Sequence, residues 1–268
     1  LEQTRKHVQV VRELFGKLGL EEEQSPGRKV VGHIGESLVA AMKMRLAQPS
    51  TLVDLSGVAE LRGTRKEGDA IVIGAMTRHA EVAASADVKG AIPALAALAE
   101  GIGDRQVRNM GTIGGSLANN DPAACYPAAV LGLGATVNTN KRKIAADDFF
   151  KGMYETALAD GELITSVSFP MAKKAAYVKF PQPASRFALV GVFVAQTAGG
   201  VRVAVTGAAS SVFRCKPLED ALAKGFTADA AKAVKVSADG LNNDLHGSAE
   251  YRAHLVSVLA SRAVAAAG

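Results

Sequence analysis

The segment that decides the fold reads Gln106-Val107-Arg108-Asn109-Met110-Gly111-Thr112-Ile113-Gly114-Gly115-Ser116-Leu117-Ala118-Asn119-Asn120-Asp121-Pro122. Two adjacent glycines stand between hydroxyl residues, and a glycine has no Cβ to keep a ligand away from the backbone. Successive free N–H groups and the hydroxyls of Thr112 and Ser116 would donate hydrogen bonds to an anion such as phosphate. From residues 112–116 alone, a glycine-rich turn between two packed elements is the simpler interpretation.

Over its whole length, the segment resembles the central loop of a known family, which reads QVRNxGTIGGxLA followed by an acidic residue and proline. The family is the FAD-binding medium subunit of molybdenum-containing hydroxylases. It includes the carbon monoxide dehydrogenase medium subunits and the flavin domain of xanthine and aldehyde oxidases. In the family this loop wraps the FAD diphosphate. The resemblance therefore implies a cofactor-binding role for Thr112, Ile113, Gly114, Gly115, Ser116 and Asp121.

A second loop, within residues 30–38, is predicted to lead from a short strand through a turn into a helix. A helix N-terminus beside glycine favours a diphosphate. The matching family loop reads AGGQSL or AGGHS, which places Gly35, Glu36 and Ser37 on its last three positions and Ile34 on its first glycine. Gly32 takes part if the register slips by one residue. His33 stays open between a loop residue near the cofactor and a proton-transfer role.

The flavin end of the predicted site rests on two further resemblances. Residues 162–164 match the family's E-L-I, whose Leu/Ile position packs near the isoalloxazine ring, so Ile164 is a candidate. A basic or polar side chain precedes the family's FxxxxSR element and reaches the flavin, and Lys179 is the candidate, with Gln182 as the alternative. A cation there would stabilise the reduced flavin anion. A solvated lysine at a strand end is the other interpretation.

Two single residues invite a functional reading that their surroundings do not favour. Cys125 stands where many family members have an aspartate, and a small buried hydrophobe is the expected role for it. His79 has no partner at a metal-ligand spacing, which favours a packing or capping role.

Composition excludes several classes of function. The 268 residues carry 31 Lys+Arg and 26 Asp+Glu, a formal charge of +5, but the basic residues are scattered and only 5% of residues are aromatic, which argues against nucleic acid. The 2 cysteines, Cys125 and Cys215, lack CxxC spacing. An iron–sulfur cluster needs about four thiolates, so this chain cannot hold one alone. No apolar run reaches the roughly 20 residues of a membrane span, and a reducing compartment, the cytoplasm, is expected.

The expected fold class is α+β. The resemblance implies a two-subdomain FAD-binding fold of the PCMH/vanillyl-alcohol-oxidase type, followed by a C-terminal α+β domain with a three-stranded antiparallel sheet. The expected domains are residues 1–55, 56–171 and 172–268. Apolar runs predict strands over 70–75 and 187–195, a polar turn over 63–68, and a return strand over 201–205 after a turn at Gly199-Gly200. Periodicity predicts helices that begin at Thr77, at Pro93 and at Ala249.

The resemblance implies an electron-transfer subunit. No Ser-His-Asp set, carboxylate pair or metal cluster is evident, as expected where a cofactor performs the chemistry. The family passes electrons from 2Fe-2S clusters in a small subunit through FAD to an external acceptor. A large subunit oxidises the substrate at molybdopterin cytosine dinucleotide, and the implied assembly is a dimer of heterotrimers. The alternatives are a scaffold subunit without FAD and a stand-alone reductase of the UDP-N-acetylenolpyruvoylglucosamine reductase type.

Overall fold

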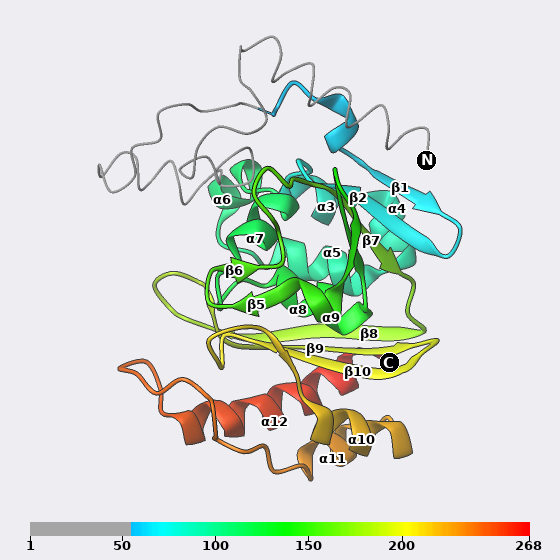
Figure 1. Ribbon diagram of the computed structural model, residues 1–268. Coiled ribbons are helices and arrows are strands. Elements are labelled where there is room, and N and C mark those ends of the chain that lie inside the picture. The colour runs from blue at the N-terminus through cyan, green and yellow to red at the C-terminus, as the bar shows by residue number, and fades with distance from the viewer. Residues whose placement is uncertain (1–54) are drawn as a thin grey trace.

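Two antiparallel sheets organise residues 55–268, which are the part of the chain that the computed structural model describes (Figure 1). The first sheet has the strand order β1-β2-β7-β3-β4. Its strands are β1 (Thr64–Glu67), β2 (Ala70–Gly74), β3 (Thr136–Thr139), β4 (Lys143–Ala145) and β7 (Ile164–Pro170). The central strand β7 has Ile164, Val167 and Phe169 fully buried in the first hydrophobic core.

Short helices fill the connections of this sheet. They are the 3₁₀ turn η1 (Ala59–Leu61), α3 (His79–Ala84), α4 (Ala86–Ala91), α5 (Pro93–Glu100), α6 (Arg105–Met110), α7 (Ile113–Asn119), α8 (Tyr126–Leu133) and α9 (Ala146–Phe149). Polar side chains cap several of them: Ser85 accepts from the first turn of α4 and Asp104 from that of α6. Such caps satisfy amides that the helix itself leaves unpaired. A hairpin of β5 (Phe150–Gly152) and β6 (Glu155–Thr156) follows α9.

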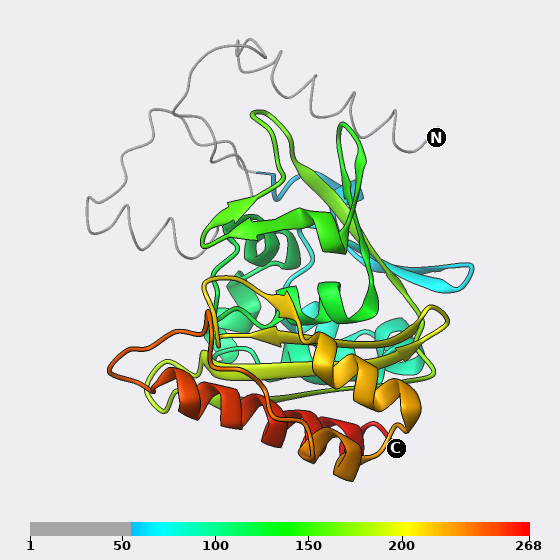
Figure 2. The ribbon, with the colours of Figure 1, turned by 60° about the horizontal axis from the view of Figure 1, so that its bottom comes forward.

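The second sheet forms the middle layer of the molecule. It has the order β11-β10-β9-β8, with β8 (Lys174–Pro181), β9 (Ala188–Thr197), β10 (Gly200–Thr206) and β11 (Phe213–Arg214). Figure 1 shows α5, α8 and α9 on one side of this sheet and the C-terminal helices on the other. Those helices are α10 (Lys216–Lys224), α11 (Ala228–Lys232) and α12 (Ala249–Ala266). In Figure 2, α12 runs along the outer side of the sheet with α10 and α11 beside it.

Strand β9 shows why this sheet is central. Successive side chains of a strand point to opposite faces. Accordingly, Phe193 and Ala195 belong to the first hydrophobic core, while Val192 and Val194 belong to the second core under α12. All four are fully buried. A strand covered on both faces is a continuous apolar run, as the sequence of β9 is.

The structure corrects the sequence-based expectation in three places. The segment 63–68, expected as a turn, contains strand β1. This strand is polar, as suits the edge position that it has among the strands of residues 55–268, where it pairs with β2. The C-terminal sheet, expected to have three strands, gains the two-residue strand β11, which pairs with β10. Residues 113–119, expected to begin as a glycine-rich turn, form helix α7.

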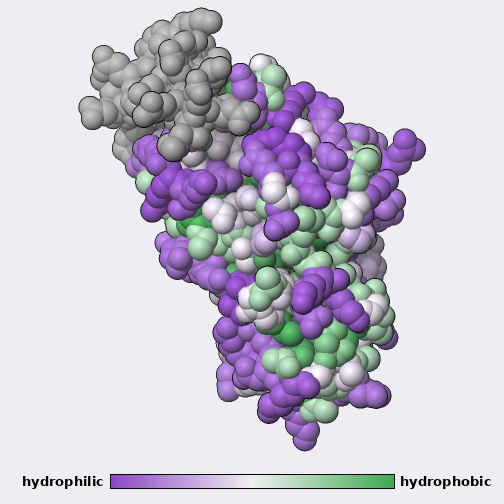
Figure 3. Space-filling model, turned by 90° about the vertical axis from the view of Figure 1, so that its right-hand side faces the viewer, coloured by the Kyte–Doolittle hydropathy of each residue, from purple (hydrophilic) through white to green (hydrophobic). Residues whose placement is uncertain are grey.

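The surface carries mostly hydrophilic side chains on the face shown in Figure 3. Hydrophobic residues reach this face mainly in its lower part, at the height of the second sheet and its covering helices. Among residues 55–268, no helix combines the length and the apolar character that crossing a membrane requires.

Candidate cofactor-binding site

The central motif begins at the start of helix α7. Thr112 is the N-cap, with extended backbone, and its Oγ1 accepts a hydrogen bond of 3.1 Å from the N–H of Gly115. The N–H of Ser116 donates to the carbonyl of Thr112 at 3.0 Å, which is the first bond of the helix. The glycine pair therefore lies in the first turn of a capped helix.

Two further amides of the motif bind the segment that directly follows strand β2. Ile113 donates to the carbonyl of Thr77 at 3.1 Å, and Gly114 donates to the carbonyl of Ala75 at 2.8 Å. Every amide from Ile113 to Ser116 thus has a partner within the chain. The expectation of successive free N–H groups at this motif is wrong, because Ile113 and Gly114 bond to the segment after β2 while Gly115 and Ser116 bond to Thr112.

What this motif presents to a ligand is its hydroxyls. Thr112 and Ser116 are partly exposed, whereas Ile113, Gly114 and Gly115 are buried. The two hydroxyl residues are four positions apart, so they share one face of α7. Each hydroxyl carries a proton to donate, since the bond from Gly115 uses only a lone pair of Thr112. The pair can bind an anion without a charged side chain.

His79 lies directly against the entry to this motif. Its backbone N–H donates to the carbonyl of Gly111 at 3.0 Å, and a Cβ at Gly111 would lie 2.5 Å from Nε2 of His79, so only glycine fits there. His79 is 5% exposed, and burial, together with the positive charge of Arg108, lowers its pKa to about 4. His79 is therefore a neutral packing residue, as its sequence context favours.

A tyrosine completes this buried cluster. The ring of Tyr126 lies 5.2 Å from that of His79, measured between centroids. Within the described residues, neither Nδ1 of His79 nor the hydroxyl of Tyr126 has a hydrogen-bond partner, although both are buried.

Among residues 55–268, no group of His, Cys, Asp and Glu side chains is arranged so that it could hold a metal ion.

Asn120 and Asp121 anchor the far end of α7. Asn120 has left-handed backbone, with φ of 44°, and its Nδ2 donates to the carbonyls of Gly152 and Glu155, each at 2.8 Å. Oδ1 of the partly exposed Asp121 accepts the N–H of Ala123 at 2.8 Å. The motif is thereby tied to the β5–β6 hairpin, a contact that sequence reasoning missed. The signal available for it was an asparagine directly after the helix, since asparagine tolerates left-handed backbone.

Lys179, on β8 of the second sheet, reaches the end of α5 and the residue that precedes α8. Its Nζ donates to the carbonyl of Gly101 at 2.7 Å and to that of Arg186 at 2.9 Å, and it lies 3.6 Å from Sγ of Cys125. Cys125 is 5% exposed, in keeping with the expected small buried residue. All three ammonium hydrogens have a neighbour within the chain, so a flavin contact by Lys179 would replace one of these bonds.

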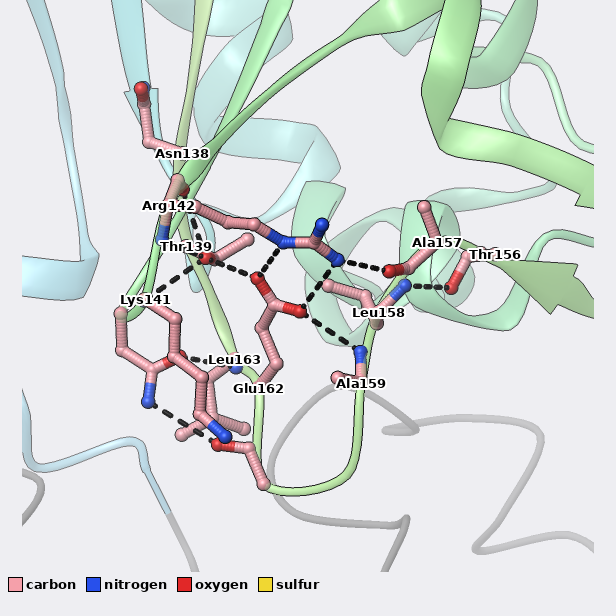
Figure 4. A network of polar contacts seen from close by, with 12 residues as sticks. Asn138, Thr139, Lys141, Arg142, Thr156, Ala157, Leu158, Ala159, Glu162 and Leu163 are labelled. Atoms are coloured by element: carbon pink, nitrogen blue, oxygen red, sulfur yellow. Dashed lines mark hydrogen bonds and ion pairs between the residues drawn. The ribbon is translucent and has the colours of Figure 1, made fainter.

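Ile164 is fully buried at the start of β7 and has no exposed side-chain surface for a ligand. Just before it, Glu162 forms a network with Arg142 and Thr139 (Figure 4). Its carboxylate accepts from Nε of Arg142 at 3.0 Å and from Oγ1 of Thr139 at 2.7 Å. Burial raises the pKa of Glu162, but hydrogen bonds led by that from Arg142 outweigh burial and hold it below the usual value. This network, also missed from the sequence, fixes the entry to β7.

The remaining predicted site residues, Gly32, Ile34, Gly35, Glu36 and Ser37, lie outside the described residues. Comparison with known proteins covers that part of the chain as well. Residues 12–172 match the model of the FAD-binding domain in molybdopterin dehydrogenase. The chain belongs to the FAD-binding medium subunits of molybdopterin dehydrogenases.

Medium subunits with curated names resemble it over most of their length. The nicotine 6-hydroxylase medium subunit of Paenarthrobacter nicotinovorans is 37% identical over 249 residues, which are 87% of this chain and 88% of that protein. The carbon monoxide dehydrogenase medium chain of Hydrogenophaga pseudoflava is 34% identical over 270 residues, covering 95% of this chain and 92% of that one.

Solved structures of such medium subunits agree with the fold. Carbon monoxide dehydrogenase from Hydrogenophaga pseudoflava superposes with a TM-score of 0.78 at 35% identity, covering 89% of this chain and 88% of that chain. Quinoline 2-oxidoreductase from Pseudomonas putida 86 superposes with a TM-score of 0.78 at 28% identity, with 88% of each chain covered. The mixed α+β architecture is therefore that of the medium subunits, and the chain is an oxidoreductase subunit.

The described residues of this medium subunit fit a flavin nucleotide in part. Among the predicted contacts, Thr112, Ser116, Asp121 and Lys179 are partly exposed and polar. The hydroxyls suit phosphate oxygens as neutral donors, and a carboxylate suits ribose hydroxyls as an acceptor. The buried members of the predicted set, Ile113, Gly114, Gly115 and Ile164, shape the scaffold beneath them.

Proposed function

We propose that this chain is the FAD-carrying electron-transfer subunit of a molybdenum hydroxylase. FAD would receive electrons from 2Fe-2S clusters of a small subunit and pass them to an external acceptor, since flavins carry out both one- and two-electron steps. The observation that carries this proposal is the match of residues 12–172 to the FAD-binding domain of molybdopterin dehydrogenase. The structure supports it through Thr112 and Ser116, two partly exposed hydroxyl residues at the start of α7.

The proposed roles of individual residues rest on the family resemblance and on which side chains are partly exposed. We propose that Thr112 and Ser116 donate to the diphosphate and that Asp121 accepts from a ribose hydroxyl. Lys179 would place a positive charge beside the flavin ring, where it favours the reduced anion. Because the side chain of Ile164 is buried, a contact there would come from its backbone. The loop of Gly32, Ile34, Gly35, Glu36 and Ser37 would complete the diphosphate site.

The metal centres would belong to partner chains. Among the described residues no metal-binding group occurs, and the two cysteines are buried and unpaired. Relatives are named as medium subunits or medium chains, that is, as parts of larger assemblies. We therefore propose a small subunit with 2Fe-2S clusters and a large subunit with molybdopterin cytosine dinucleotide, arranged as a dimer of heterotrimers in the cytoplasm.

Reconstitution tests this relay. The chain loaded with FAD is mixed anaerobically with the substrate of the complex, first alone, then with each partner subunit, then with both. The proposal predicts that the flavin absorption bleaches only when both partners are present. Bleaching with the chain alone would contradict it and would favour a stand-alone reductase of the UDP-N-acetylenolpyruvoylglucosamine reductase type.

A scaffold subunit without FAD is the second candidate. The internal bonding of every amide from Ile113 to Ser116 favours it, because these groups are not free for phosphate. The two proposals differ in one property. A scaffold would stay colourless after incubation with excess FAD and gel filtration, whereas a flavoprotein would retain the yellow cofactor.

A further inference from the structure

The segment from Asp121 to Cys125 joins α7 to α8 without forming a helix or strand of its own. It carries the proposed ribose contact at Asp121 and runs directly beside the second sheet. Its shape must therefore be set by the groups that hold its backbone.

Besides two hydrogen bonds within the segment, from Ala123 and Ala124 to Asp121, the end of strand β10 supplies such groups. Oγ1 of Thr206 lies 2.7 Å from the carbonyl of Pro122 and 2.7 Å from that of Ala124, and the N–H of Gly207 donates to Pro122 at 2.7 Å. Thr206 is 0% exposed. The Thr206 hydroxyl, whose one proton is shared between two carbonyls, and the buried amide of Gly207, directly after β10, thus contact the segment at short distance.

Gly207 is shaped for this contact. Its φ is +80°, a conformation that favours glycine, and a Cβ there would collide with the backbone carbonyl of Ala188. The chain therefore passes close to β9 at this point and turns its N–H toward Pro122. On the neighbouring strand β8, Lys179 reaches Cys125 at the other end of the segment. The second sheet contacts the segment at both ends.

We propose that Thr206 is a positioning residue for FAD: it fixes residues 121–125 in the conformation that the nucleotide requires. This inference rests on the proposed function. It assigns part of the cofactor affinity to a residue outside residues 12–172, the region that matches the FAD-binding domain. Thr206 then acts on the cofactor site without touching the cofactor.

Three variants test it in the full chain. Thr206→Val removes the donor while keeping the shape of the side chain, and Thr206→Ser keeps the donor. Thr197→Val is the matched control, since Oγ1 of Thr197 donates to the carbonyl of Gly200 in the exposed β9–β10 turn. FAD dissociation constants are measured at a temperature where apo circular dichroism shows all variants folded. Thr206→Val should weaken binding by about tenfold or more, while the serine and control variants stay within about twofold of the parent chain.

A double-variant cycle separates positioning from a general loss of structure. Asp121→Asn weakens the proposed ribose contact directly. If Thr206 acts through the same segment, the losses of Thr206→Val and Asp121→Asn combine to less than their product. If the double variant loses FAD affinity by the full product of the two single losses, the proposal is overturned. It is also overturned if Thr206→Val binds FAD as tightly as the parent chain. If the parent chain itself binds no FAD, the proposed function fails instead.

Hydrogen exchange on the unmodified chain keeps the test valid should Thr206→Val not fold. FAD should slow exchange of the Gly207 amide, which donates to Pro122, relative to the amide of Val203, which donates to Glu219 elsewhere on β10. Equal effects at both amides, or no effect at either, would overturn the coupling between segment and sheet.

Discussion

At the residue scale, His79 shows how a titratable group can serve packing. Its imidazole fills the space that a side chain at Gly111 would need, and its Nδ1 has no partner among the described residues. Burial and the nearby Arg108 hold it neutral. As a consequence, the stability of the folded protein depends on pH.

The direction of that dependence follows from the two pKa values. His79 has a pKa of about 4 when folded and 6.5 by the reference value, so the unfolded chain binds more protons between them. The contribution of neutral His79 to the free energy of unfolding is fully present above pH 6.5. It is lost as the pH drops toward 4, and the loss is about 3 kcal/mol at most. Urea unfolding at several pH values should show a flatter pH profile for His79→Gln than for the parent chain. Parallel profiles would rule out this role.

Ser116 is the cleaner test of the hydroxyl pair, because Thr112 also caps α7. Removing one hydrogen bond to a charged phosphate should raise the FAD dissociation constant by about tenfold in Ser116→Ala. Ser257→Ala, which removes a hydroxyl from α12, should leave FAD binding unchanged. Fluorescence titration with FAD measures both variants. Unchanged affinity in Ser116→Ala would remove Ser116 from the site.

At the scale of elements, the Glu162 network joins the turn between β3 and β4 to the start of β7. The side chain of Glu162 is 1% exposed, and that of its partner Arg142 is 52% exposed. Glu162→Gln should lower the free energy of unfolding by about 2–3 kcal/mol, since it weakens charge-assisted bonds at a buried site. The control Glu67→Gln breaks an exposed pair with Arg65 and should cost less than about 1 kcal/mol. Equal losses would show that burial of Glu162 contributes nothing.

Two glycines in helices should respond to alanine substitution with stability changes of opposite sign. A Cβ at Gly132 of α8 would lie 2.7 Å from Cδ1 of Phe193 on β9, whereas one at Gly90 of α4 meets nothing within 4 Å. Alanine should therefore destabilise the protein at Gly132 by roughly 1–3 kcal/mol. At Gly90 it should stabilise by up to about 1 kcal/mol. Thermal unfolding of both variants decides whether α8 packs on β9 as closely as the structure has it.

At the scale of the whole molecule, the sequence predicted the family, the mixed α+β class and most apolar elements. Strand β2, helix α5 and the β9–β10 hairpin were predictable because local composition and packing agree there. The path of Thr112–Ser116 was not, because a Gly-Gly pair indicates a turn. The helix forms through a threonine cap and through bonds to Ala75 and Thr77.

Less of the candidate site than of the fold could be predicted from the sequence. Family resemblance selected candidate residues for the cofactor site, but it did not separate the partly exposed Thr112 and Ser116 from the buried glycines. Thr206 and Asn120 were missed because their contacts join distant parts of the chain, 84 and 32 residues apart for Thr206–Pro122 and Asn120–Gly152. A local pattern can mark one residue, as the asparagine after α7 does, but it does not encode the distant partner, which appears only once the sheets are placed.

The most direct test is a titration of the purified chain, freed of flavin, with FAD, followed by visible absorption and by quantification of the nucleotide retained after gel filtration. Saturable binding in an equimolar ratio, weakened by Ser116→Ala and unaffected by Ser257→Ala, is the predicted result. A chain that stays colourless, or that retains as much FAD when Thr112 and Ser116 are both replaced by alanine, would contradict a flavin site at the start of α7.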